Sequence, residues 1–195
     1  MATRNILKDG ERGLEKTSRV VTDFNKRLHI LLDDMRETLI EANGLGLAAP
    51  QVGVLRRAVL IVDTSIGGEL PEDAGEEEIN KLYNEQIIEM INPEIISSDG
   101  EQTGSEGCLS VPGVYGMVTR PNTVLFKAQD RNGKEYTLEV SELAARAVCH
   151  EIDHLNGVLF TSVAERILSE EEMEEMRRQN EQSEENDSAK EIDNQ

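Results

Sequence analysis

Two histidines and a glutamate lie within five residues of one another in the sequence HEIDH, residues 150–154. If this segment is helical, four residues make about one turn, so both imidazoles project from one face and a single metal ion can bridge them. The carboxylate of Glu151 then reaches a water at the ion without being a ligand, which is the position of a general base. Taken alone, the motif also fits a chance pairing on an ordinary amphipathic helix.

A third ligand is available from the sequence EGCLS, residues 106–110, which we expect to form a loop because of its glycine. A thiolate at Cys108 completes three protein ligands with His150 and His154 and leaves a fourth position for water, which indicates a catalytic site. Alternatively, Cys108 is a small buried core residue, since free cysteines are often buried.

The glycine-rich sequence GLGLAAPQ, residues 44–51, is the third chemical segment. Its small residues let a backbone approach another group closely, and Gln51 adds a side-chain donor. The segment does not have the GxGxxG spacing, follows a predicted helix rather than a strand, and precedes no Lys-Ser/Thr pair. A nucleotide-binding loop is therefore excluded.

The elements that must position these segments follow from hydrophobic periodicity and turn residues. We predict a helix over Phe24–Asn43, a helix from the N-cap Ser141 to Asn156-Gly157 that carries HEIDH, and a helical start at Ser169–Glu172. Strands are predicted at Arg57–Asp63, Met90–Ser97, Thr123–Gln129 and Glu135–Val140, the last two forming a hairpin around Asn132-Gly133, and a long loop at Ser65–Asn80. This order indicates an α+β fold with antiparallel sheets.

Composition narrows the class of protein further. The chain has 195 residues, 37% of them hydrophobic, which suits one compact core, and no run approaches the roughly 20 apolar residues of a membrane helix. Two cysteines are too few for a disulfide scaffold, so we expect a cytoplasmic protein with no membrane partner. Of the net charge of −19, residues 169–195 contribute −8 and residues 69–89 contribute −7, which excludes direct nucleic-acid binding by either segment.

Together and in this order, GLGLAAPQ, EGCLS and HEIDH closely resemble the three signature motifs of peptide deformylases. The resemblance spans roughly residues 2–160. It implies antiparallel sheets around a central helix that carries HExxH, plus a C-terminal helix. We therefore expect a catalytic domain at residues 1–168 and an acidic, helical or disordered tail at residues 169–195.

The resemblance also implies a function, namely removal of the N-formyl group from the N-terminal methionine of newly made polypeptides, with release of formate. It makes Cys108, His150 and His154 the metal ligands and Glu151 the acid and base. Gln51 and the Leu109 N–H become the donors to the oxyanion. Family behaviour favours Fe²⁺ in the cell, although one thiolate and two imidazoles also suit Zn²⁺, Ni²⁺ or Co²⁺.

Substrate binding in the family implies that the peptide lies as an added strand against Leu45, Gly46 and Gly107. The methionine side chain would then meet Leu45, Leu143 and Ala147. Tyr115 stands where some members place a peptide-binding arginine, so the resemblance does not extend to that contact. The nascent peptides imply transient proximity to the ribosome, but the acidic residues 170–185 do not support a grip on its RNA.

Four residues near these motifs are expected to be structural. His29 lies in the middle of the early helix, and Cys149 points away from its neighbour His150. Arg120 and Asp153 either support the HEIDH helix as a pair or form a plain surface pair.

Two rival functions remain open from the sequence. A zincin-like metallopeptidase shares HExxH but takes its third ligand downstream, where only acidic candidates such as Glu165 occur. A catalytically inactive metal-binding or nascent-chain-binding module is the second rival, and the presence of Glu151 and Gln51 argues against it.

Overall fold

The chain folds into two antiparallel sheets and three helices, followed by a helical segment that begins at residue 170, in the part that the computed structural model describes, residues 2–67, 75–175 and 178. In chain order the elements are α1 (Lys26–Glu41), β1 (Gly46–Ala48), the 3-10 turn η1 (Ala49–Val52), β2 (Ala58–Val62), α2 (Glu76–Gln86), β3 (Ile87–Asp99), β4 (Gln102–Cys108), β5 (Val111–Arg120), β6 (Thr123–Gln129), β7 (Glu135–Ser141), α3 (Glu142–Leu155), the 3-10 turn η2 (Phe160–Ser162) and β8 (Arg166–Ile167).

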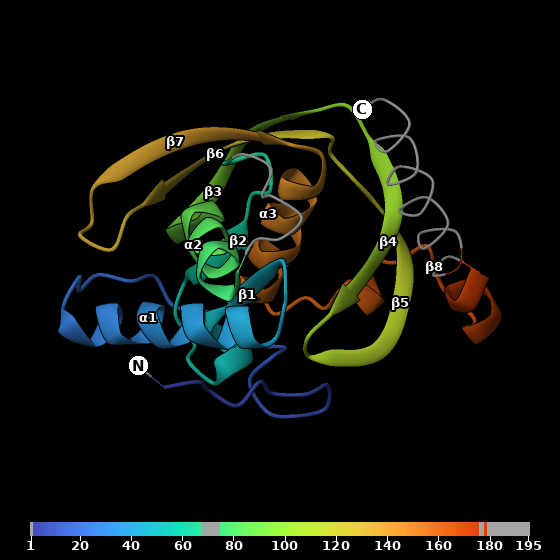
Figure 1. The fold of residues 1–195 in the computed structure, drawn as a ribbon, viewed down its shortest axis with the longest axis horizontal. Helices are drawn as coiled ribbons and strands as arrows, with labels where there is room; N and C mark the ends of the chain where they lie inside the picture. The colour runs from blue at the N-terminus through green and yellow to red at the C-terminus, as the bar shows by residue number, and fades with distance from the viewer. Residues whose placement is uncertain (1, 68–74, 176–177, 179–195) are drawn as a thin grey trace.

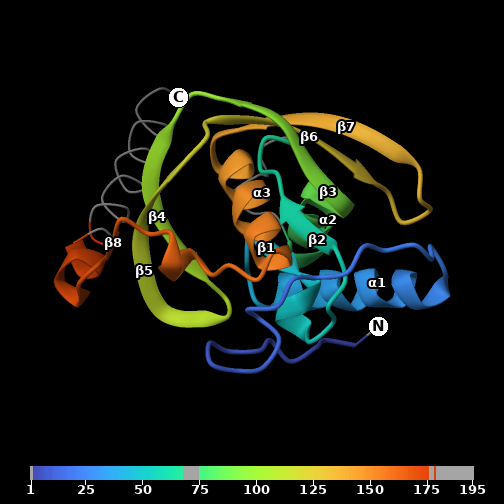
Figure 2. The ribbon, with the colours of Figure 1, turned by 180° about the vertical axis from the view of Figure 1, so that it is seen from behind.

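One sheet has the strand order β1-β2-β3-β6-β7, and the other has the order β4-β5-β8. Every pairing between these strands is antiparallel. The two views in Figures 1 and 2 place α3 between the larger sheet and the strands β4 and β5, while α1 lies across one end of the molecule. The α+β class with antiparallel sheets is thus confirmed.

Strand β2 explains how the larger sheet holds helices on both faces. Its five residues are all buried, and successive side chains of a strand point to opposite faces. Leu60 packs in the cluster that contains the apolar stripe of α1, whereas Val59 and Ile61 pack in the cluster that contains α3. The continuous apolar sequence of β2 is therefore what a strand between two helices requires.

Both long helices begin near the predicted residues. Asn25 caps α1 by accepting from the backbone N–H groups of Arg27 and Leu28, and Asn43 ends it in the left-handed conformation, with φ 48°. Ser141 is the N-cap residue of α3 but makes no side-chain cap, because its hydroxyl pairs with Thr123 Oγ1 on β6 at 3.1 Å. The helix that carries HEIDH therefore starts directly from the sheet.

The β6–β7 hairpin is confirmed, but its turn differs from the one predicted. Only Gly133 has a positive φ, +84°, and Asn132 does not. The turn spans residues 130–134 and is held by Asp130, whose carboxylate accepts from the backbone N–H groups of Asn132 and Lys134. The turn thus has one left-handed residue, whereas a two-residue turn would need two. Hydrogen bonds to the carboxylate of Asp130 stabilise it instead.

Two predictions from the sequence need correction, the extent of one loop and the loop setting of Cys108. The loop predicted for Ser65–Asn80 ends early, since α2 begins at Glu76, where acidic residues favour a helix N-terminus; residues 68–74 lie outside the described residues. The strand predicted at Met90–Ser97 is confirmed within β3, where the register shift between Ile91 and Glu94 accommodates the missing N–H of Pro93. Cys108 ends strand β4 and is not in a loop.

The predicted C-terminal helix is described only at its start. Ser169 and Glu172 exchange side-chain to backbone hydrogen bonds at 2.9 and 3.3 Å, which is a capping box, and residues 170–175 and 178 are helical. Residues 176–177 and 179–195 lie outside the described residues. Among the helices that are described, none is long and apolar enough to cross a bilayer.

Candidate active site

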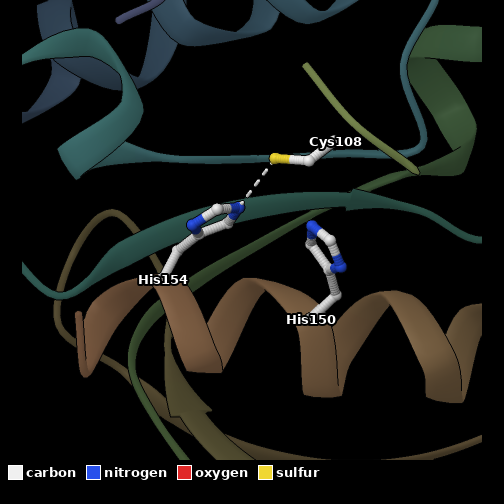
Figure 3. Close-up of side chains that lie close together, drawn as sticks. All are labelled: Cys108, His150 and His154. Atoms are coloured by element: carbon white, nitrogen blue, oxygen red, sulfur yellow. Dashed lines mark hydrogen bonds between the residues drawn. The ribbon is translucent and has the colours of Figure 1, made fainter. Parts of the chain in front are cut away.

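Helix α3 presents His150 and His154 on the same side, one turn apart, with ring centroids separated by 4.9 Å. Figure 3 shows both imidazoles rising from α3 toward Cys108. The sulfur of Cys108 lies 3.2 Å from Nε2 of His154. One ligand atom from each of the three residues falls within 4.8 Å of the others, so a single ion can contact all three.

The surroundings of each donor atom suit a metal ion. The sulfur of Cys108 lies 3.4 Å from the backbone N–H of Ser110 and 3.5 Å from the amide nitrogen of Gln51, two donors directed at the sulfur. Burial lowers the pKa of His154 to about 3, so its imidazole is neutral at pH 7. A thiolate and a neutral imidazole are the forms that bind metals.

Glu106 orients the remaining ligand, His150. The carboxylate of Glu106 is 5% exposed and lies 3.0 Å from Nδ1 of His150, which leaves Nε2 of that ring available. Burial raises the pKa of Glu106, but hydrogen bonds from His150 and Arg120 outweigh burial and lower that pKa to about 2. The carboxylate is therefore ionised, and the proton of His150 is held at Nδ1.

Two arginines hold Glu106 in place. Arg120 donates from Nε and Nη2 at 2.9 and 3.1 Å, and Arg146 donates from Nη1 at 2.9 Å. Arg120 also pairs with Asp153 at 2.7 Å, and Arg146 donates to the carbonyl oxygens of Gln102 and Val118. Because Arg120 and Asp153 belong to this network, they are not a plain surface pair. The network joins α3 to β4, the two elements that carry the three ligands, and also to β5.

Neither Glu106 nor Arg146 is predicted as a site residue from the motifs, although each is a charged residue in a setting that indicates burial. Glu106 is the only charged residue of EGCLS. If it is buried, its carboxylate would destabilise the fold unless a partner paired with it. Arg146 interrupts the apolar residues Ala144, Ala145, Ala147 and Val148 at the start of α3, and it is 8% exposed. Buried charges are rarely tolerated unless they are paired, so both positions indicate a partner across the fold.

We expect Glu106→Gln to weaken metal binding by about 10- to 100-fold, because an amide no longer fixes the proton of His150 on Nδ1. The measurement is metal affinity by competition with a chromogenic chelator. Glu89→Gln is the matched control, since Glu89 is also a largely buried carboxylate held by two arginines, Arg36 and Arg131. Both variants should lower Tm, but equal losses of metal affinity in both would rule out the orienting role of Glu106.

Glu151 lies beside the ligands and is almost fully buried, with 3% exposure. Its Oε2 atom has no hydrogen-bond partner among the described residues. Burial raises the pKa of this carboxyl to about 7. A buried carboxylate with an unused oxygen next to three metal-binding groups suits the transfer of a proton.

The close approach of Glu151 to the backbone explains one glycine of the GLGLAAPQ segment. A Cβ atom at Gly46 would lie 2.3 Å from Oε1 of Glu151 and 2.7 Å from its carboxyl carbon. Neither distance is a possible contact, so only glycine lets β1 pass this carboxylate.

We expect Gly46→Ala to displace the Glu151 carboxylate and to lower turnover about 100-fold, the lower end of the range for loss of an acid–base group. Metal content should stay at one ion per chain, since Gly46 does not contact the ligands. The comparison is kcat and metal content against Gly75→Ala, whose added Cβ would meet nothing within 4 Å. Wild-type turnover in Gly46→Ala would show that the Glu151 position tolerates movement.

Hydrogen bonds at both ends of its side-chain amide hold Gln51 in place. Its Oε1 accepts from the Ala48 N–H at 2.8 Å, and its Nε2 faces Ser110 Oγ at 3.2 Å and the Cys108 sulfur. The side chain is 1% exposed. The neighbouring residue Leu109 is held through its carbonyl oxygen, which accepts from Lys8 Nζ at 2.8 Å.

A cavity of about 580 Å³ contains this site. Cys108, His150, Glu151 and Gln51 line it, and so do the residues predicted to bind the peptide, which are Leu45, Gly46, Gly107, Leu143 and Ala147. Leu45 and Leu143 are 41% and 45% exposed. The structure thus brings together three motifs that are spread over residues 44–154 of the sequence.

Three other residues lie outside the ligand cluster. Glu165 accepts from Thr119 Oγ1 at 2.6 Å and is absent from the cluster, so the zincin-like reading has no downstream ligand in the described residues. His29 Nε2 contacts the carbonyl oxygen of Arg131 at 2.8 Å, which is a structural role. Burial raises the pKa of the Cys149 thiol to about 11, consistent with packing.

Comparison with known proteins identifies the family. A sequence model of the polypeptide deformylase family matches residues 3–170. This chain belongs to the polypeptide deformylase family. The peptide deformylase of Caldicellulosiruptor bescii is 51% identical over 177 residues, covering 91% of this chain and 95% of that protein, and peptide deformylase 1 of Bacillus subtilis is 44% identical, covering 90% and 99%.

Solved deformylases have the same fold. The crystal structure of a peptide deformylase from Legionella pneumophila superposes with a TM-score of 0.71 at 36% identity, covering 96% of this chain and 98% of that chain. The deformylase from Thermotoga maritima gives a TM-score of 0.72 at 31% identity, covering 85% and 100%. The sheets and helices of this chain are therefore a deformylase fold.

Proposed function

We propose that this deformylase works with one divalent metal ion held by Cys108, His150 and His154. As a member of its family, the enzyme removes the formyl group from the N-terminal methionine of newly made polypeptides and releases formate. The observation that supports the proposed ligands is the convergence of their three donor atoms within 4.8 Å beside the buried Glu151. We propose Fe²⁺ as the ion in the cell, with Zn²⁺, Ni²⁺ or Co²⁺ as replacements.

The ion acidifies water and polarises the formyl carbonyl when it is bound. Glu151 takes a proton from the attacking water at its free Oε2 and delivers it to the leaving amine of methionine. Gln51 Nε2 and the backbone N–H of Leu109 donate to the oxyanion that forms on the formyl carbon. Because the Gln51 amide is fixed by Ala48, its donor needs no reorganisation during the reaction.

The exposed edge of β1 supports our proposal that the peptide binds as an added strand. Val62 N–H donates to Leu45 O, and Leu45 lies opposite Val62 by extension of the register Gly46↔Ile61. Hydrogen-bonded pairs alternate with non-bonded pairs in an antiparallel ladder, so Gly46 directs its N–H and C=O away from β2. Strand β1 is the edge of its sheet, and these two groups are available to a peptide.

The proposal also gives the N-terminal methionine of the peptide a binding position next to the edge of β1. We propose that Leu45, Leu143 and Ala147 contact the methionine side chain and that Gly107 contributes the opposite wall. Tyr115 lies across from Gly107 in the β4–β5 ladder and lines the cavity, so an aromatic ring replaces the arginine of some relatives at the outer end.

The proposal also covers the domain bounds, the central helix, the cellular location and the partners of the protein. Residues 1–168 form the catalytic domain and residues 169–195 an acidic tail, which the family match to residues 3–170 supports. Helix α3 is the central element of that domain. The protein works in the cytoplasm, with transient proximity to the ribosome. It makes no direct contact with nucleic acid, since its acidic segments repel phosphates.

The experiment that tests the function measures formate and peptide products from formyl-Met-Ala-Ser and from Met-Ala-Ser. We expect stoichiometric formate from the formylated peptide and no reaction with the other. Internal cleavage of either peptide would instead indicate a metallopeptidase, and absence of any product with a fully metallated protein would indicate a binding module.

A further inference from the structure

Helix α2 belongs to the acidic segment between β2 and β3, and one of its side chains reaches the wall of the catalytic cavity. The hydroxyl of Tyr83 donates to the carbonyl oxygen of Gly44, which lines the cavity. Tyr83 is partly buried against the apolar cluster of α1 and β2. The segment between β2 and β3 therefore contacts the glycine-rich motif directly.

A small movement of Gly44 would displace two neighbouring groups of the site. The chain leaves α1 through the left-handed residue Asn43 and enters β1 at Gly46, so Gly44 sets the approach to the peptide-binding edge. A Cβ at Gly44 would lie 2.9 Å from Cδ1 of Leu109, which shows that the Leu109 side chain packs directly on this glycine. Gly44 thus leads directly into Gly46 and packs against the Leu109 side chain.

Helix α2 is itself anchored by contacts that do not involve the Tyr83 hydroxyl. Arg36 Nη1 on α1 donates to the carbonyl oxygen of Asn84 at 2.9 Å, and the N–H of Asp63 donates to the carbonyl oxygen of Gln86 at 2.9 Å. The helix can therefore serve as a rigid support, and removal of one hydroxyl leaves it in place.

We propose that Tyr83 is a positioning residue for peptide binding: by holding the Gly44 carbonyl, it keeps the edge of β1 and the Leu109 side chain in the arrangement that receives the formylated peptide. This role rests on the proposed binding of the peptide by Gly46 and involves the Leu109 side chain, not the backbone N–H that donates to the oxyanion. Tyr83 does not touch the reacting atoms, so its hydroxyl acts on the binding of the peptide and leaves proton transfer and metal binding unchanged.

The test compares Tyr83→Phe with Tyr136→Phe in the metallated full-length protein. Tyr136 is a matched control because its hydroxyl also donates to a backbone carbonyl, that of Glu89, at 2.7 Å, outside the catalytic cavity. For formyl-Met-Ala-Ser we expect Tyr83→Phe to raise KM about fivefold with kcat within about twofold, because a lost binding contact raises KM alone. Tyr136→Phe should leave both constants unchanged, and both variants should keep one metal ion.

Peptide affinity provides a second readout that does not need turnover. The Kd of the product Met-Ala-Ser, measured by calorimetry, should rise about fivefold in Tyr83→Phe and stay constant in Tyr136→Phe. An unchanged KM and Kd in Tyr83→Phe, or the same increases in both variants, would overturn the proposal. Wild-type protein that binds Met-Ala-Ser but releases no formate would contradict the proposed function, while the Kd comparison would still decide the role of Tyr83.

Discussion

Replacing Glu151 with glutamine is expected to lower kcat about 1000-fold while leaving one metal ion per chain, within the range for loss of an acid–base group. The amide has nearly the same shape as the carboxylate and fits beside Gly46, but it cannot accept the proton of water. Glu151 is not one of the three clustered ligands, so the ion should remain. Steady-state kinetics with formyl-Met-Ala-Ser and metal analysis of the same samples give the two values.

The pH profile separates loss of a base from general damage. Burial raises the pKa of Glu151 to about 7, and a bound cation next to it lowers this value because positive charge favours the carboxylate. The base must be deprotonated, so wild-type kcat/KM should rise with pH, with a midpoint at or below about pH 7, and then reach a plateau. Glu151→Gln should lose this rise.

Glu139→Gln provides the control for the Glu151 variant, since Glu139 is an exposed glutamate on β7. We expect wild-type kcat and an unchanged pH profile. If Glu151→Gln kept kcat within tenfold of wild type, another group would have to move the proton. If it lost the ion, Glu151 would act through the metal site instead.

The local features of the site could be predicted from sequence because they depend on short-range spacing. HEIDH needs only one helical turn to bring its imidazoles together, and the apolar residues from Leu143 to Leu155 predict that helix. In the same way, Asn132-Gly133 between two apolar runs predicts the β6–β7 hairpin, although not the exact form of its turn. These predictions use residues that are close together in the chain, and the structure agrees with them.

Strands β4 and β5 were harder to predict because their sequence lacks a strand pattern. Gly104, Gly107, Gly113 and Gly116 interrupt the stretch, and glycine is usually depleted in strands. The structure supplies the reason for two of them. A Cβ at Gly107 would lie 2.7 Å from the Tyr115 ring, and one at Gly116 would lie 2.9 Å from Ala164. Close packing by distant residues, which spacing cannot reveal, selects glycine there.

The support of the ligands was unpredictable for the same physical reason. Glu106 binds Arg120, Arg146 and His150, which lie 14 to 44 residues away in sequence. Sequence can show that a charge stands in an apolar setting, but the partner that stabilises it depends on the fold. The orientation of His150 by Glu106 can therefore be recognised only in the folded structure, in which α3 packs against β4.

Replacing Cys108 with alanine is expected to have the largest effect on the ion itself. Two imidazoles remain, and the only anionic ligand is lost, so metal affinity should fall by more than the about 10- to 100-fold expected for the supporting residue Glu106. Formate release should become undetectable as the ion dissociates. Metal per chain, measured by inductively coupled plasma mass spectrometry after gel filtration, checks the first result.

Cys149→Ala is the matched control because it removes the only other thiol, one residue before His150. That thiol is buried in the cluster between α3 and the larger sheet, so its loss should lower stability slightly and keep the ion. A fully metallated and active Cys108→Ala protein would disprove the proposed ligand set.

Thermal unfolding links the ligand set to the fold. An ion that binds only the folded protein stabilises it by RT ln(1 + [L]/Kd), so added metal should raise the Tm of metal-depleted wild type and of Cys149→Ala. The sulfur that ends β4 and the imidazoles of α3 come from separate elements, and one ion bound to all three joins them. Without the sulfur, the ion contacts α3 alone and no longer joins α3 to β4, so at the same metal concentration the rise in Tm of Cys108→Ala should be much smaller than that of wild type.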